Sequence, residues 1–503
     1  MASRRAGALL VAALVLVAAA SCTSHESSDE EGDDVTPATV DRPAGAAAKL
    51  GGPLTGGHGI NLVTAGGGPS LAEVGYTEAE YTASGTATSY ATTQDPSPTD
   101  GHLELEPNGE AEYTTRVVVR RPADPAAFNG TVVLEWLNVS AGADSAPGYT
   151  YLADELVRGG YAWVGVSAQQ VGIEGGVVAA APDVEGAGLG RGLKANDPER
   201  YGSLDHPGDA FSYDMYTQVA RALRAPDSPD PLDGLDVRWV VAMGQSQSAA
   251  ALTTYVNGVQ PLTEAFDGFL IHSRFGGAAP LGEPGEAFEI VSMIRSDPVP
   301  LRTDGRAPVL VVETETDVVG FLLYLPARQP DDERLRLWEI AGTAHADKTQ
   351  AGAGEALFGC PLPINRGQQR FVLRAALRHL VGWVEGRSSP PEADRLEVDD
   401  SGAAPRLVVD DVGNARGGVR TPAVDAPVDV LSGTAQPGAP IVCLLSGSTV
   451  PLDEAQLAAR YESPDDYLAQ YEAATDDMIE RGFALRDDRD QLLADADPGR
   501  LAG

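Results

Sequence analysis

VRWVVAMGQSQSA, residues 237–249, is the stretch of sequence that decides the fold. Its first seven residues, Val237–Met243, are mostly apolar and predict a buried strand, and the small residues at its end predict the start of a helix. A sharp turn from a strand into a helix needs small residues two positions before and two positions after its central residue, because the two elements approach closely there. Gly244 and Ser248 meet this need. We therefore expect Ser246 at the tip of the turn, as a nucleophile with its hydroxyl presented to a substrate.

The pentapeptide by itself is a weak signal, because a second one occurs in the chain. Residues 68–72, GPSLA, fit the same pattern around Ser70. No buried strand leads into Ser70, so we reject it as a nucleophile. The strand and helix that flank Ser246 decide the choice.

Strands and helices alternate on both sides of this turn. β-branched runs alternate with helical segments from about Thr115 to Pro390, which predicts a mostly parallel sheet covered by helices. The predicted strands are 116–120, 131–137, 161–167, 237–243, 268–272, 309–313 and 335–340, and the predicted helices are 149–158, 209–223, 249–256 and 368–385.

A length of 503 residues exceeds what one hydrophobic core usually organises, so we expect additions to a central domain. In the last addition we expect a short apolar strand at Ile441–Leu445 and two or three acidic helices from Asp453 onward. The expected parts are an irregular, β-leaning N-terminal region at 46–114, a core at 115–390 with lid excursions near 169–207 and 275–305, and a C-terminal extension at 391–503 packed on the core.

The N-terminus is typical of an export signal. Two arginines precede an apolar run, Ala6–Ala20, and Cys22 follows. This run has about 15 residues, whereas a membrane span needs about 20. We predict a lipoprotein signal peptide at 1–21, lipidation of Cys22 and an acidic tether at 22–45; ordinary cleavage beside an incidental cysteine is the alternative. The protein is then exported, and either held on the outer side of the cell membrane by its lipid anchor or secreted.

Charge and motif content exclude several classes of function. The 36 Lys and Arg residues stand against 73 Asp and Glu residues, and the formal charge of −37 repels phosphate backbones, so we expect no nucleic-acid partner. The sequence contains no His-Glu-x-x-His, no Cys-x-x-Cys and no phosphate-binding loop, so we expect no metal and no cofactor. The oligomeric state stays open.

A serine nucleophile needs a histidine base, and three of the seven histidines follow Ser246. His345 lies in AGTAHAD, residues 341–347, a loop of small residues directly after a predicted strand, and we assign it as the base. His272 closes a strand and is expected in the core or in the wall of a cleft. His379 lies between apolar residues of a helix, where a structural role is expected.

The acid that orients the histidine is expected in PVLVVETETD, residues 308–317. This segment is a buried strand followed by a turn rich in carboxylates, which can accept a hydrogen bond from the imidazole. We favour Asp317, with Glu315 as the alternative acid and Glu313 as a more distant third.

The oxyanion of the reaction needs two N–H donors. One is expected from Gln247, the residue after the nucleophile, and the other from the loop that follows the strand 131–137. In that loop the sequence leaves Asn138 and Val139 open. Cys360 and Cys443 are a possible disulfide in an oxidising compartment, although the sequence does not show that they are close.

The chain resembles a group of bacterial α/β-hydrolase-domain proteins from about residue 75 to its end. The resemblance implies the α/β-hydrolase fold, supports Ser246 and His345 as site residues, and names no substrate. It rests on residues 116–122 (RVVVRRP), 128–140 (FNGTVVLEWLNVS), 201–214 (YGSLDHPGDAFSYD), 244–249 (GQSQSA), 342–347 (GTAHAD) and 413–422 (GNARGGVRTP).

These residues favour a serine hydrolase that cleaves a carboxylic ester through an acyl-enzyme intermediate. Its expected partner is a small-molecule or lipid-like ester. A cell-envelope amidase or acyltransferase shares the same chemistry and is the alternative enzyme. From another class, the alternative is a surface-anchored binding lipoprotein with an inactive hydrolase fold.

Overall fold

The computed structural model describes residues 42–501, with gaps at 96–97, 180–188, 227 and 436–437. The predicted signal peptide, Cys22 and most of the predicted tether lie outside the described residues. No helix in the described part of the chain is long and apolar enough to cross a membrane.

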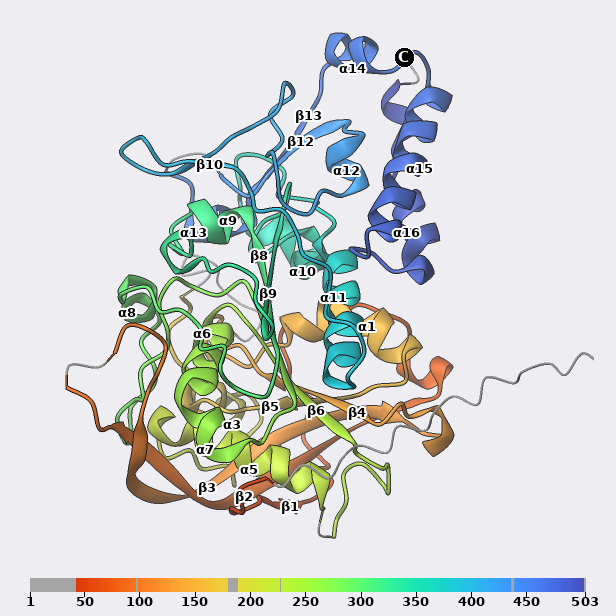
Figure 1. The fold of residues 1–503 in the computed structure, drawn as a ribbon. Coiled ribbons are helices and arrows are strands. Elements are labelled where there is room, and N and C mark those ends of the chain that lie inside the picture. Colours follow the sequence, from red (N-terminus) through yellow and green to blue (C-terminus); the bar gives the residue numbers. More distant parts are fainter. Residues whose placement is uncertain (1–41, 96–97, 180–188, 227, 436–437, 502–503) are drawn as a thin grey trace, which may run out of the picture. The chain divides into compact units, whose positions relative to one another are not determined.

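One sheet of nine strands organises the described residues (Figure 1). Its strand order is β1-β2-β3-β5-β4-β6-β7-β8-β9. The strands from β5 to β9 pair in parallel, and β1, β2 and β3 are antiparallel additions. The predicted α/β-hydrolase fold, with a mostly parallel sheet, is thus confirmed. The strands are β1 (Lys49–Gly51), β2 (Tyr76–Thr92), β3 (Leu105–Pro122), β4 (Thr131–Trp136), β5 (Ala162–Val166), β6 (Trp239–Gln245), β7 (Gly268–His272), β8 (Val309–Thr314) and β9 (Leu335–Ile340).

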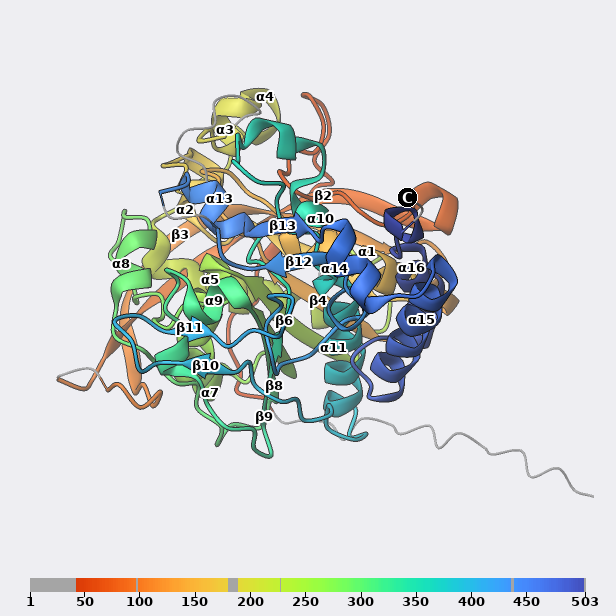
Figure 2. The ribbon, with the colours of Figure 1, turned by 90° about the horizontal axis from the view of Figure 1, so that it is seen from above.

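Helices cover both faces of the parallel strands, which explains why these strands are continuous apolar runs. Every residue of β4, β5, β7, β8 and β9 is buried. Side by side on one face lie α1 and α11, and α5 and α6 pack on the other (Figures 1 and 2). The helices of this part are α1 (Pro147–Arg158), α2 (Gln170–Glu174), α3 (Leu193–Asn196), α4 (Pro198–Tyr201), α5 (Ser212–Arg224), α6 (Gln247–Thr254), α7 (Gln260–Thr263), α8 (Ile290–Arg295), α9 (Glu315–Val319), α10 (Lys348–Ala351) and α11 (Gln369–Val384).

The N-terminal region is more regular than its composition indicates. β2 and β3 pair along their whole length, from Tyr76 opposite Pro122 to Thr92 opposite Leu105. The domain boundary that we predicted at residue 114 falls within β3. The second half of this strand, at residues 117–120, pairs with β5 and so belongs to the same sheet. Threonine and tyrosine in β2 favour strands, but they give little hydrophobic periodicity, which is why the sequence looked irregular here.

The C-terminal extension also joins the core through main-chain pairing, because Val419 lies as a parallel bridge beside Ile340 of β9. The predicted strand at Ile441–Leu445 is wrong: residues Ile441–Ser446 form helix α13, which begins directly after Pro440. A short apolar run fits a buried helix as well as a strand, and here tertiary contacts decide. Further elements of the extension are β10 (Val398–Asp399), β11 (Arg406–Leu407), α12 (Pro422–Asp425), β12 (Asp429–Ser432), β13 (Ser448–Pro451), α14 (Glu454–Arg460), α15 (Pro464–Glu480) and α16 (Arg489–Ala494).

Candidate active site

Ser246 forms a strained turn between β6 and α6. Its backbone has φ 63° and ψ −122°, a conformation that non-glycine residues rarely adopt. A Cβ on Gly244 would lie 2.9 Å from the carbonyl carbon and oxygen of Ser248, so the turn requires glycine at this position. The strand-turn-helix geometry predicted from residues 237–249 is present.

Ser246, His345 and Asp317 form a continuous hydrogen-bonded series. The Oγ of Ser246 lies 2.8 Å from Nε2 of His345, and Nδ1 of His345 lies 2.7 Å from Oδ1 of Asp317. The three residues follow β6, β9 and β8, whose carboxyl ends share one edge of the sheet. All three side chains are buried, and Ser246 keeps 6% of its surface exposed.

The surroundings of Asp317 favour its carboxylate form. Burial by itself raises the pKa of Asp317, but the His345 ring and the hydrogen bonds from His345 and Thr314 outweigh burial and hold this pKa below its ordinary value. The Thr314 N–H and hydroxyl both donate to Oδ2, at 2.7 Å each. An ionised Asp317 accepts the Nδ1 proton of His345, which leaves Nε2 free to accept the proton of Ser246.

The alternative acids lie elsewhere. Glu315 accepts the backbone N–H groups of Gly342, at 2.5 Å, and Gly433, at 2.7 Å. Burial raises the pKa of Glu315 to about 7. Glu313 faces the N–H of Arg274 at 3.3 Å, and burial raises its pKa well above the ordinary range. Of the three candidate carboxylates, Asp317 is the one bonded to the imidazole.

Two N–H groups near Ser246 are available for an oxyanion. Gln247 begins α6, so its N–H has no carbonyl within the helix to bond. Among the described residues the N–H of Val139 has no hydrogen-bond partner either. The N–H of Asn138 donates to the Ser145 carbonyl at 2.9 Å, which excludes it as the second donor that the sequence left open. Asn138 instead shapes the loop, because its Oδ1 accepts the N–H of Ser140 at 2.8 Å.

Sequence reasoning missed a chain of side-chain contacts that connects the three catalytic segments. Asn138 Nδ2 donates to the carbonyl of Gln245 at 2.9 Å. The Gln245 side chain in turn donates to the carbonyl of His345 at 3.1 Å. The position of Gln245, next to the nucleophile, was the available signal for its role. These contacts fix the loop after β4, the turn at Ser246 and the His345 loop relative to one another.

The histidines and the serine that we rejected as base and nucleophile lie outside the hydrogen-bonded series. His272 is fully buried, and its Nε2 lies 3.2 Å from Oε1 of Gln369. The Nε2 of His379 bonds the Gly482 carbonyl at 2.9 Å. Ser70 is exposed and directly precedes a short 3-10 helix, Leu71–Val74.

The two excursions named as lids meet at one buried carboxylate. Asp209 accepts the N–H of Gln170 through Oδ1 and the N–H of Phe288 through Oδ2, each at 2.7 Å. In the first excursion, the N–H of Gly190 also donates to the carbonyl of Ala141, in the loop that carries Val139. The first excursion therefore borders the loop that carries Val139, and Asp209 joins the second excursion to the first. Asp209 belongs to the quoted motif YGSLDHPGDAFSYD, yet no sequence feature distinguished its role.

Comparison with known proteins agrees with this geometry. Residues 50–494 match the family described as alpha/beta hydrolase domain. The chain belongs to this family. No curated protein sequence matches the chain.

Solved structures similar to this hydrolase have low sequence identity. One is an α/β serine hydrolase without lid from Xanthomonas campestris, with 14% identity, a TM-score of 0.26, and coverage of 52% of this chain and 85% of that one. Another is a fungal esterase from Rhizomucor miehei, with 11% identity, a TM-score of 0.31, and coverage of 60% and 85%. A third is a glucuronoyl esterase from Solibacter usitatus, with 10% identity, a TM-score of 0.24, and coverage of 53% and 78%.

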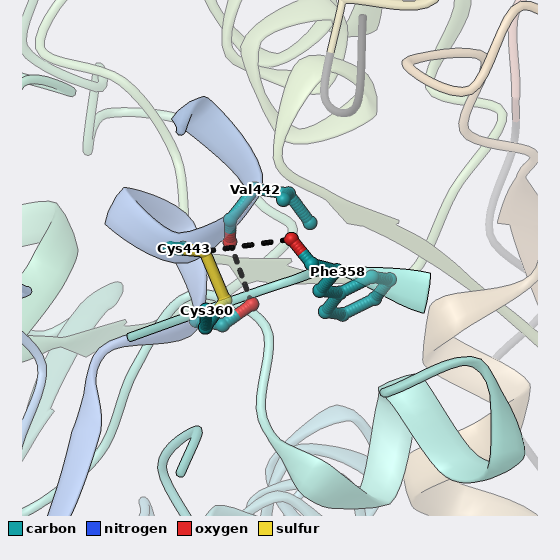
Figure 3. The surroundings of a disulfide bond; sticks show 5 residues. Phe358, Cys360, Val442 and Cys443 are labelled. Atoms are coloured by element: carbon teal, nitrogen blue, oxygen red, sulfur yellow. Dashed lines mark hydrogen bonds between the residues drawn. A yellow bond between two sulfur atoms is a disulfide. The ribbon is translucent and has the colours of Figure 1, made fainter. Parts of the chain in front are cut away.

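The hydrolase also contains the disulfide that the sequence left open. Cys360 and Cys443 are bonded, with a sequence separation of 83 residues (Figure 3). Cys443 belongs to α13 of the C-terminal extension, and Cys360 follows the His345 loop. The bond therefore joins the extension to the segment that carries the histidine.

Proposed function

We propose that this hydrolase cleaves carboxylic esters through an acyl-enzyme intermediate. The observation that carries the proposal is the series of hydrogen bonds from Ser246 Oγ to His345 Nε2 and from His345 Nδ1 to Asp317, built on a strained turn. This arrangement provides a nucleophile, a base and an orienting acid in the roles that acyl transfer requires.

In the proposed mechanism each of these residues has one role. Ser246 Oγ attacks the acyl carbon while His345 Nε2 takes its proton, and the negative charge on the acyl oxygen is stabilised by the N–H groups of Gln247 and Val139. His345 then donates the proton to the leaving alkoxide, which departs as an alcohol. Water then attacks the acyl carbon while His345 takes its proton, and His345 returns that proton to Ser246 Oγ as the acyl–Oγ bond breaks and the acid is released.

The proposed substrate is a small-molecule or lipid-like ester. Export and attachment through Cys22 remain proposals that rest on the sequence of the first 22 residues. Under that proposal the membrane is contacted through the lipid anchor alone.

A fluorophosphonate probe tests the assignment of the nucleophile, because it forms a stable bond only with an activated serine. The wild-type protein and the Ser70→Ala variant should be labelled at the same rate, and Ser246→Ala should not be labelled. A burst of p-nitrophenol from p-nitrophenyl acetate, absent in Ser246→Ala, would support the acyl-enzyme. Equal labelling of Ser246→Ala and wild type would rule out this nucleophile, and a folded wild-type protein that reacts with neither reagent would rule out the hydrolase.

A further inference from the structure

Gly433 of the C-terminal extension lies between the segments that carry Asp317 and His345. Its N–H donates to Oε2 of Glu315 at 2.7 Å, and its carbonyl accepts the hydroxyl of Thr316 at 2.6 Å. A Cβ at residue 433 would lie 2.4 Å from the carbonyl oxygen of Thr343 and 2.5 Å from Cβ of Glu315. Only glycine fits this space, so at this point the extension contacts both segments through its backbone alone.

The hydroxyl of Thr316 is shared by three segments of the chain. It donates to Gly433 and accepts the backbone N–H of His345 at 3.1 Å. Thr316 itself is buried and directly precedes Asp317. The backbone of the histidine is therefore fixed to the turn that carries the acid through one hydroxyl, and that hydroxyl is oriented by the extension.

Glu315 makes a second connection of the same kind. One carboxylate oxygen accepts the N–H of Gly342, at the start of the His345 loop, and the other accepts the N–H of Gly433. Both oxygens are used, so the carboxylate joins the His345 loop to the extension.

A second part of the extension contacts the His345 loop as well. The N–H of Ala346 donates to the carbonyl of Leu445 in α13 at 3.0 Å. A Cβ on Gly447 would lie 2.9 Å from Cβ of Ala344. The disulfide at Cys443 anchors α13 in this position (Figure 3). Gly433 and residues 445–447 therefore lie next to each other, and both contact the loop.

We propose that Gly433 and residues 445–447 of the C-terminal extension complete the catalytic apparatus, with Glu315 and Thr316 as positioning residues that hold the His345 loop on the Asp317 turn. The inference rests on the proposed function, because it assigns these residues to the same Ser246, His345 and Asp317. Neither Glu315 nor Thr316 touches the substrate in this scheme. They act by holding His345 in position relative to Ser246 and Asp317. A displacement of about 1 Å in such a site lowers the rate about 100-fold.

Three threonine variants test the shared hydroxyl. Thr316→Val keeps the shape of the side chain and removes the hydroxyl, whereas Thr316→Ser keeps the hydroxyl. Thr475→Val is the matched control, because Thr475 is a fully buried threonine of the extension whose hydroxyl donates to the Tyr471 carbonyl in its own helix. For p-nitrophenyl acetate, kcat of Thr316→Val should fall about 10- to 100-fold with KM within about twofold of wild type, and Thr316→Ser should recover most of the activity. Thr475→Val should keep wild-type kcat.

Glu315→Gln gives a second measurement if Thr316→Val does not fold. Its control is Glu135→Gln, since Glu135 is also buried, also has a pKa raised to about 7 by burial, and also accepts two backbone N–H groups, those of Gly148 and Tyr149. Both variants should lose similar thermal stability, but only Glu315→Gln should lose kcat and the rate of fluorophosphonate labelling.

The outcomes separate the inference from the proposed function. If wild type is labelled at Ser246 and Thr316→Val and Glu315→Gln retain wild-type kcat, the inference fails and the hydrolase stands. The inference also fails if the control variants lose as much kcat as their partners, or if Thr316→Ser is no better than Thr316→Val. If wild type itself is not labelled, the proposed function fails, and the inference that rests on it fails as well.

Discussion

At the scale of single residues, Glu315 and Asp317 show how two similar side chains acquire different surroundings. Both lie in the first turn of α9, two positions apart. Residues two apart on a helix point about 200° away from each other, so one carboxylate faces the imidazole while the other faces the amides of Gly342 and Gly433. The sequence predicts that both lie in this turn. It cannot predict the rotation of the turn relative to His345, because residues far along the chain set that rotation.

His272 gives a prediction about pH. Burial lowers the pKa of its imidazole to about 4, against an ordinary value of 6.5, and the ring stays neutral with its Nε2 bonded to Gln369. Between pH 6.5 and pH 4 the unfolded chain binds this proton and the folded chain does not, so the free energy of unfolding falls as the pH falls. The contribution of His272 across this window is on the order of 3 kcal/mol.

The variant His272→Gln removes this titration while its side-chain amide can still donate to Gln369. Urea unfolding at pH 6.5, 5 and 4 should show that the variant loses less stability on acidification than wild type. His102→Gln changes a half-exposed ring and serves as the control that follows wild type. Parallel curves for wild type and His272→Gln would contradict the assignment of a buried neutral imidazole.

At the scale of elements, the loop after β4 is held by one asparagine. The side chain of Asn138 bonds Ser140 within the loop and Gln245 at the end of β6, and in the proposed mechanism the N–H of Val139 in this loop stabilises the oxyanion. Loss of an oxyanion donor costs about 100- to 1000-fold in kcat. Because Asn138→Ala loosens the donor without removing it, we expect kcat to fall by about 10- to 100-fold with little change in KM.

Asn129 at the start of β4 provides the control for this measurement. Its side chain makes the same two kinds of bond, accepting the N–H of Thr131 and donating to the carbonyl of Gly159. Asn129→Ala should lower the melting temperature about as much as Asn138→Ala while keeping kcat. Equal losses of kcat in the two variants would show that Asn138 has no particular connection to the reaction.

The predictability of the elements follows the strength of their local pattern. β6, β8 and β9 are buried on both faces, so their apolar runs identify them, and the loops that follow them carry Ser246, Asp317 and His345. α13 has an equally apolar sequence, but its six residues are too few to show a period. β2 lacks a clear apolar stripe. Its pairing with β3 along the whole strand is not visible in its local sequence.

At the scale of the whole molecule, the C-terminal extension is tied to the core at positions that no local pattern reveals. Gly433 lies 118 residues from Glu315, and Val419 pairs with Ile340 across the edge of the sheet. Contacts between residues so far apart in sequence depend on the path of the chain. The sequence therefore predicted that residues 391–503 form an extension, and could not predict that one of its glycines contacts both the turn before Asp317 and the His345 loop.

The disulfide gives a prediction at this scale. Closing a loop of this length in the unfolded chain stabilises the folded state by about 4 to 5 kcal/mol in the chain-entropy description. Cys360→Ser, Cys443→Ser and the double variant should each lower the free energy of unfolding by up to about this amount, measured by urea unfolding without reductant. Because the two cysteines act as one bond, the double variant should lose no more than a single one. Additive losses would contradict a shared bond.

The contacts of Gly433 also determine how much of the chain must be synthesised before the contacts around Ser246, His345 and Asp317 can be complete. The ribosome makes Ser246, Asp317 and His345 well before it reaches Gly433 and residues 445–447, which contact the His345 loop or the turn before Asp317. A nascent chain that ends between these points carries the reactive groups without the contacts that align them. Under the two proposals, a chain that has not yet reached residue 447 is therefore expected to lack ester-cleaving activity.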